Sequence, residues 1–222
     1  MKVTVRTLHE LGKQVVLAPE RHLLASRLGG GIFLGELVIE RRQTIDVHHA
    51  HRAHHEGALV LDTTHAKDGV LDVPAALRAE AGHRANFFLT TSRRKKRACN
   101  GDVVVSRLRP YLRQIALVHP AAIALEKERS LALSTEFYVL APARHGEDIA
   151  FLLPFLLSSK IQSLLADAQE GGHHPRVPRE SLLALRVPHA LVEARQKTNA
   201  KVRSALERYY RAAHDLQCAL CL

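Results

Sequence analysis

The sequence has little cysteine, no tryptophan and no long apolar run. Three cysteines among 222 residues are too few for a disulfide framework, and their scarcity suits a reducing compartment. Apolar runs such as residues 149–157 are far shorter than the roughly 20 residues of a membrane-spanning helix, and no signal peptide is expected. These absences argue against a secreted disulfide scaffold and a membrane protein, and they predict a cytoplasmic protein.

Familiar motifs of catalysis are also missing. The chain has no Walker-type phosphate loop, no glycine-rich dinucleotide fingerprint, no Asn/Asp-Pro-Pro-aromatic methyltransferase motif and no nuclease pattern of Asp followed by Glu-x-Lys. Asp102 follows a glycine and precedes a β-branched run, so it is expected to be a turn residue and not a general acid. The sequence predicts a non-catalytic protein without a cofactor.

Positive charge is in excess and is concentrated in one region. The chain has 32 Lys and Arg against 22 Asp and Glu, a formal charge of +10. Residues 84–113 hold nine of these cations and a single acid. This concentration predicts one electropositive patch for nucleic acid, an acidic membrane face or an acidic protein. No lipidation signal supports the membrane alternative.

Short strands are expected over most of the first two-thirds of the chain. Apolar and β-branched segments bounded by turn residues predict them at 2–8, 32–40, 58–73, 86–91, 101–106, 115–119 and 135–142. Helices are expected at 19–28, at 147–169 and at 178–185, and the second is divided into two pieces by Pro154 and the pair of serines after it. The expected fold is α/β (mixed α+β), with a twisted mixed β-sheet plus helices over residues 1–190.

A long helix is expected over residues 191–222. Apolar side chains recur there at alternating steps of three and four, at Val202, Leu206, Tyr209, Ala213, Leu216 and Leu220. This heptad pattern is typical of a coiled coil. The helix either packs back on its own domain or pairs with another long helix, and the sequence leaves both arrangements open.

Several short motifs occur in a recognisable order. They are "GDVVVSR" at 101–107, "STEF" at 134–137, "GGHHPR" at 171–176 and "VP" at 187–188, followed by the long helix. Their order resembles one target-recognition domain and one spacer helix of the specificity subunits of type I restriction-modification systems, over residues 57–215. Those subunits usually carry two of each, and this chain has room for one.

The resemblance implies sequence-specific binding of double-stranded DNA. In that family the spacer helices set the distance between two half-targets and dock methyltransferase (M) subunits, and a translocating nuclease (R) subunit completes the system. Two copies of this chain would therefore pair through residues 191–222 as a homodimer and recognise a symmetric two-part target. The chemistry on the DNA would belong to the partner subunits.

The basic stretches supply the expected DNA contacts. These are Arg93, Arg94, Lys95, Lys96, Arg97, Arg107, Arg109, Tyr111 and Arg113, with His173, His174 and Arg176 as further candidates. A loop at 93–97 could follow the phosphates of a duplex. In an extended segment, residues 107, 109, 111 and 113 would share one face, where Tyr111 could stack on a base. A solvated surface without a partner remains the alternative.

Two other features carry weaker alternatives. The stretch "HHAHRAHH" at 48–55 lacks an acid or cysteine to complete a zinc site, so an exposed or DNA-facing loop is expected. Cys218 and Cys221 form a lone CxxC pair at a helix end, without a second pair for zinc. The competing functions are a defence adaptor or decoy that binds a protein through its long helix, and an enzyme that uses the histidines.

Overall fold

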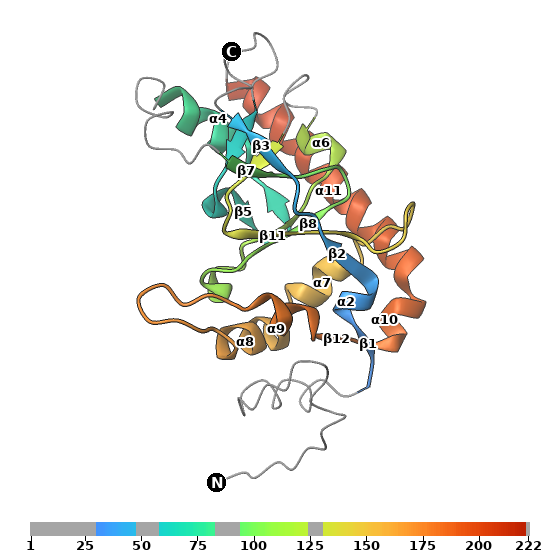
Figure 1. Ribbon diagram of the computed structural model, residues 1–222. Coiled ribbons are helices and arrows are strands. Elements are labelled where there is room, and N and C mark those ends of the chain that lie inside the picture. Colours follow the sequence, from blue (N-terminus) through green and yellow to red (C-terminus); the bar gives the residue numbers. More distant parts are fainter. Residues whose placement is uncertain (1–29, 48–57, 83–93, 124–130, 221–222) are drawn as a thin grey trace.

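The computed structural model describes residues 30–47, 58–82, 94–123 and 131–220 (Figure 1). Several expectations fall outside these ranges: the strand at 2–8, the helix at 19–28, the histidines of 48–55, the strand at 86–91, Arg93 and Cys221.

Two four-stranded sheets form the centre of the molecule. The first has the order β2 (Val38–Glu40), β11 (Phe137–Pro142), β8 (Val103–Ser106) and β9 (Ile115–Leu117), with antiparallel neighbours throughout. The second has the order β3 (Thr44–Asp46), β7 (Arg94–Arg97), β10 (Leu131–Leu133) and β4 (Leu59–Leu61). Its β10–β4 pair is parallel and its other pairs are antiparallel. The expected mixed α+β class is confirmed, with the strands divided between two sheets.

Two small ribbons complete the β-structure. They are β1 (Ile32–Phe33) with β12 (Arg186–Val187), and β5 (Ala66–Lys67) with β6 (Val70–Leu71), which follows the 3-10 helix η2 (Thr63–His65). The segment expected at 58–73 as two strands joined by an Asp-Gly turn therefore contains three short strands, with that turn between the last two.

Helices surround the sheets. They are α2 (Leu34–Leu37), α4 (Val73–Gly82), α6 (Pro120–Ile123), α7 (Leu152–Leu156), α8 (Ser159–Asp167), α9 (Arg179–Leu183), α10 (His189–Glu193) and α11 (Arg195–Leu220). The expected division of 147–169 is confirmed at the pair of serines, where Ser158 caps α8 by accepting a hydrogen bond from the Ile161 amide. Pro154 does not break the chain there, since it lies inside α7. Among the described helices, none combines the length and the apolar character that crossing a membrane requires.

The glycine-aspartate turn before β8 holds a partly buried ion pair. The Asp102 side chain is only 1% exposed and accepts hydrogen bonds from Arg41 Nε at 2.8 Å and Arg41 Nη2 at 3.1 Å. The Cys99 amide donates a third bond to this carboxylate at 2.8 Å. Asp102 is thus the turn residue that the sequence predicted. After it, Val103, Val104 and Val105 enter the core fully buried.

The first half of α11 packs against its own domain. Leu206 and Tyr210 are 6% and 3% exposed, and the Leu71 amide donates to the Tyr210 hydroxyl at 2.8 Å. Asn199 Nδ2 donates to the Asp148 carbonyl at 3.0 Å, and the Arg203 guanidinium pairs with the Asp148 carboxylate. Four side chains on successive turns therefore fix the direction of the helix.

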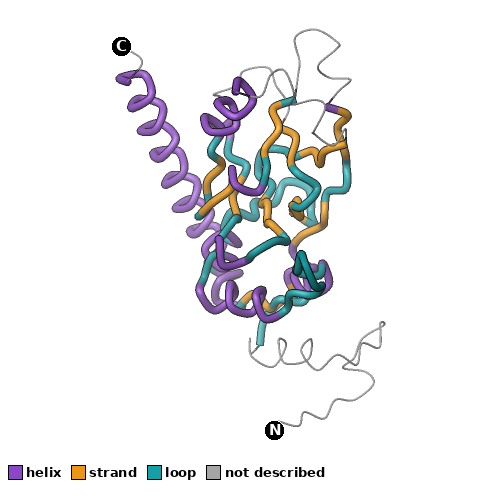
Figure 2. Tube along the Cα trace, turned by 90° about the vertical axis from the view of Figure 1, so that its left-hand side faces the viewer, coloured by secondary structure: helices purple, strands orange, loops and turns teal. Residues whose placement is uncertain are grey.

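This packing corrects part of the expected pairing surface. Leu206 is buried in the core of its own domain and Val202 packs partly buried against that core, so neither side chain is available to a second helix. The helix expected from residue 191 is also interrupted at Ala194, between α10 and α11. Beyond Tyr210, Leu216 and Leu220 are 61% and 78% exposed. In Figure 2 the last turns of α11 stand clear of the sheets.

Candidate nucleic-acid interface

The basic run at residues 94–97 is strand β7, whereas a loop was expected. The strand β7 is hydrogen-bonded to β3 on one side and to β10 on the other. Its side chains therefore alternate between the two faces of the sheet. Lys95 lies opposite Ile45 and is 8% exposed, whereas Lys96 points to the other face. The loop of cations expected to follow the phosphates is therefore wrong for residues 94–97, since the strand divides their charges between the two faces of the sheet.

Lys96 joins a cluster around Glu40. Its ammonium donates to Glu40 Oε1 at 3.0 Å and to the Phe137 carbonyl at 2.6 Å. The other oxygen of Glu40 accepts from Arg179 Nε at 2.8 Å. The carboxylate is 8% exposed, while the Arg179 side chain remains 37% exposed. Glu40 thus neutralises Lys96 and orients an arginine that solvent can reach.

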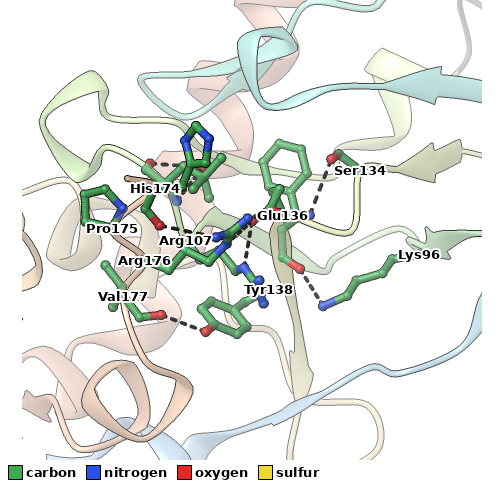
Figure 3. A network of polar contacts seen from close by, with 12 residues as sticks. Lys96, Arg107, Ser134, Glu136, Tyr138, His174, Pro175, Arg176 and Val177 are labelled. Atoms are coloured by element: carbon green, nitrogen blue, oxygen red, sulfur yellow. Dashed lines mark hydrogen bonds and ion pairs between the residues drawn. The ribbon is translucent and has the colours of Figure 1, made fainter. Parts of the chain in front are cut away.

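A second carboxylate, Glu136, binds two arginines (Figure 3). Arg107 Nε donates to its Oε2 at 2.7 Å. Arg176 is bidentate, with Nε at 3.0 Å from Oε2 and Nη2 at 2.8 Å from Oε1. Paired guanidinium groups in this geometry are strongly oriented and keep other N–H groups for a ligand. Both arginines remain about one-third exposed, at 32% and 40%.

The charge state of Glu136 follows from these partners. Hydrogen bonds from Arg176 and then Arg107 outweigh the effect of burial and lower the pKa of this carboxyl from 4.5 to about 2. A carboxyl with a depressed pKa stabilises the folded state at pH values above 4.5, and that contribution is lost as the pH falls towards 2. At neutral pH the three side chains therefore carry one net positive charge.

Main-chain pairing brings these two arginines together. The Val177 amide donates to the Arg107 carbonyl at 2.8 Å, and Leu108 and Arg176 form an antiparallel bridge. The hydroxyl of Tyr138 donates to the Val177 carbonyl at 2.7 Å, and Lys96 Nζ lies 5.6 Å from the centre of its ring. Tyr138 therefore sits between the Glu136 cluster and the Glu40 cluster and links them.

The segment after β8 does not continue as an extended strand. Residues Pro110–Leu112 form the 3-10 helix η3, flanked by Arg109 and Arg113 in the left-handed region with φ of 44° and 54°. The prediction that residues 107, 109, 111 and 113 share one face is therefore wrong. The Arg113 guanidinium donates to the Asp68 carboxylate at the surface and to the Leu157 carbonyl, while Arg109 and Tyr111 are exposed.

These groups make up what we call the cationic surface: Lys96, Arg107, Arg109, Arg176 and Arg179. Four of these cations pair with the two carboxylates of Glu40 and Glu136, and Arg109 is exposed, so positive charge remains in excess. His173 and His174 lie exposed in the adjoining loop, which is closed by main-chain hydrogen bonds between Glu170 and Arg176. Such a surface is suited to a polyanion.

Solved structures share this fold. A chain from a structural study of the complex assembly and conformational transition of the type I R-M system matches 87% of this chain, with 22% identity and a TM-score of 0.50. This protein has the fold of that type I R-M chain. The match covers 46% of the solved chain, so the present sequence spans about half of its length.

A second solved structure, the HsdS subunit from Thermoanaerobacter tengcongensis, matches 86% of this chain and 45% of its own at 22% identity, with a TM-score of 0.48. No protein-family model and no curated protein matches the sequence. The resemblance to a type I R-M component that the sequence motifs predicted is confirmed at the level of the fold.

Three of the short motifs noted in the sequence converge in the structure. Arg107 ends the first motif, Glu136 lies in the second and Arg176 ends the third, and their side chains meet at one point. The sequence indicated Glu136 only as a member of the "STEF" motif at 134–137. It did not indicate Glu40, Arg41 or Arg179 as residues of the site. The signal for Arg179 was weak: a single arginine directly after Pro178 at a helix start.

No metal centre is apparent among the residues that the structure describes. Within 30–47, 58–82, 94–123 and 131–220, no group of three or more His, Cys, Asp or Glu side chains converges. Cys218 is exposed on α11, close to His214.

Proposed function

We propose that this chain is a non-catalytic DNA specificity subunit of a type I restriction-modification system or a related defence system. The observation that carries the proposal is the convergence of Arg107 and Arg176 on Glu136, beside Lys96 and Arg179 on Glu40. Residues 1–190 would form the target-recognition domain and residues 191–222 the spacer helix. The likeness to a type I R-M chain supports this assignment.

The cationic surface has the chemistry of a duplex-binding site. Contacts to phosphates position a protein on DNA, and contacts to base edges specify the sequence. Arg107 and Arg176 keep free N–H groups that suit a phosphate or the acceptor edge of guanine. Arg109, His173 and His174 project around them and extend the contact area. The strand β7 also carries Arg94, Lys95 and Arg97. These three cations would contribute mainly to the positive electrostatic potential around the site.

Partner subunits would supply the chemistry. A methyltransferase subunit that uses a methyl donor, and a translocating nuclease subunit, would dock on the helix and act on the DNA that the recognition domain selects. The chain itself would need no cofactor. Its place of work would be the cytoplasm, where the cellular DNA lies.

The test of this function is selection from duplexes with a randomised segment. Purified protein is mixed with the pool, bound duplexes are recovered and amplified, and the enriched sequences are read. We expect a two-part motif whose halves are identical and inverted, because two copies of one domain read it. If the bound pool remains random after repeated rounds, the protein is an adaptor or decoy with non-specific DNA binding, and the proposed function is wrong.

The exposed end of α11 would hold two copies together. Tyr209, Ala213, Leu216 and Leu220 follow a heptad pattern on this part of the helix, and the three large side chains are 51–78% exposed. We expect light scattering to show a dimer, and the substitution Leu216→Lys to yield a monomer, because it places a charge in the apolar contact. The control is Ser204→Lys, on another side of the same helix. A monomeric wild type would exclude self-pairing.

A further inference from the structure

The turn between β8 and β9 has an uncommon backbone. Among the residues that the structure describes, three other than glycine have a positive φ. Arg109 and Arg113 flank η3 in this turn, and Asp68 lies in the β5–β6 turn that contacts it. The Asp68 amide donates to the Arg113 carbonyl at 3.0 Å, and their side chains form an ion pair. Residues other than glycine rarely adopt this backbone conformation, and it persists only where surrounding contacts fix it.

Those contacts make the turn rigid. Pro110 is buried, and the Leu112 and Arg113 amides donate to the carbonyls of Arg109 and Pro110 at 2.9 and 2.8 Å. Arg113 Nη1 donates to the Leu157 carbonyl at 2.6 Å, which ties the turn to the end of α7. The tip of the turn is therefore held in one conformation before any partner arrives.

This rigid tip presents apolar side chains to solvent. Tyr111 is 65% exposed and Leu112 is 37% exposed, and Arg109 beside them is exposed as well. Leu108, just before the turn, pairs with Arg176. The tip is thus joined to the segment that carries Arg176, a member of the cationic surface, by this bridge and by the hydrogen bond from the Val177 amide to the Arg107 carbonyl. Positive charge around an apolar tip favours a nucleic acid over an apolar protein surface as its partner.

We propose that Tyr111 and Leu112 form a wedge that enters between neighbouring base pairs of bound DNA. The wedge unstacks one base step and bends the duplex while the cationic surface holds its backbone. Inserted apolar side chains act in this way in proteins that deform DNA, and pyrimidine–purine steps yield most easily. The wedge would add sequence preference at a step that receives no base-edge hydrogen bond. This inference rests on the proposed function, since it requires binding of duplex DNA.

The experiment uses short duplexes that carry the sequence recovered by selection, or a random sequence if selection enriches none. The fluorescent base 2-aminopurine is placed at each pyrimidine–purine step of the duplex in turn. Its fluorescence rises when its neighbours unstack. With wild-type protein we expect a several-fold rise at one step. The double variant Tyr111→Ala/Leu112→Ala should bind about tenfold more weakly and give no rise when saturated with DNA. The variant Tyr111→Phe/Leu112→Met should restore the signal.

The matched control is Ile39→Ala, an exposed apolar side chain on β2 that is 55% exposed. It should leave both affinity and fluorescence unchanged. The wedge is wrong if wild-type protein binds the duplexes without a fluorescence change at any step, or if the Ala/Ala variant gives the same rise. If that variant loses only its affinity for a methyltransferase subunit, the tip is a protein contact. Absence of all DNA binding by wild-type protein would instead overturn the proposed function itself.

Discussion

Replacing both Arg107 and Arg176 by glutamine is expected to weaken the binding of duplex DNA by about 100-fold at moderate salt. Each side chain makes charge-assisted hydrogen bonds, and such bonds are worth about 1.5–3 kcal/mol. The substitutions also leave the Glu136 carboxylate without its two partners, so that it repels phosphate. Titration of labelled duplex at several salt concentrations measures the affinity, and the slope of log K against log salt should fall by about 2.

The matched control for this variant removes the same charge elsewhere. Arg144→Gln with Arg208→Gln changes two exposed arginines that lie outside the cationic surface. It should weaken binding by much less, because it affects only the overall field. Adding Glu136→Gln to the Arg107/Arg176 variant should recover part of the lost affinity by removing the unpaired carboxylate. Equal losses in the control and the double variant would show that net charge, and not this cluster, binds the DNA.

The substitution Asp102→Ala is expected to lower the free energy of unfolding by about 3 kcal/mol. The Asp102 carboxylate is almost fully buried, so its removal leaves the partly buried Arg41 guanidinium without its charge-assisted partner and the Cys99 amide without its acceptor. Urea unfolding followed by circular dichroism measures the change. Asp102→Asn should cost less, because an amide oxygen still accepts a hydrogen bond. Glu193→Ala, at an exposed carboxylate on α10, serves as the control and should change stability little.

Should Asp102→Ala unfold at the same urea concentration as wild type, the turn before β8 does not depend on the partly buried pair. The position of Arg107 would then depend on its bond to Glu136 and on main-chain hydrogen bonds, and not on the turn. DNA binding measured on the folded Asp102→Ala variant shows whether Asp102 also affects the position of Arg107. The free energy of unfolding and the affinity for DNA are measured separately.

Local patterns predicted the elements whose signals are local. A β-branched run predicted β8, an apolar run with aromatic residues predicted β11, and the serine pair that includes Ser158 marked the division between α7 and α8. The strand β7 was missed because Lys and Arg have low strand propensity. Its extended conformation comes from pairing with β3 and β10. Both of these strands are far from β7 in the sequence, so no local pattern indicates the pairing. The η3 turn was missed although Pro110 was noted, because left-handed arginines on both sides have no sequence signature.

The site was harder to predict than the fold. Charged residues were found by composition, but their partners were not, since Arg107, Glu136 and Arg176 meet only after β8, β11 and the 170–176 loop come together. The heptad pattern on α11 was visible, yet it does not distinguish packing against the helix's own domain from packing against a second helix. The structure assigns the first half of the helix to the domain through Leu206 and Tyr210.

The shared carboxylate of Glu136 has a kinetic consequence. Beyond a Debye length of about 8 Å, an approaching duplex senses one net charge from the three side chains, so this cluster adds little to the rate of encounter. At contact each guanidinium still offers N–H groups in a fixed orientation, so it adds strongly to the lifetime of the complex. Substitution of Arg107 or Arg176 should therefore shorten residence on DNA more than substitution of Arg109. The rate of association should fall by a similar small amount in all three variants, because each removes one unit of charge from the field that the duplex senses at a distance.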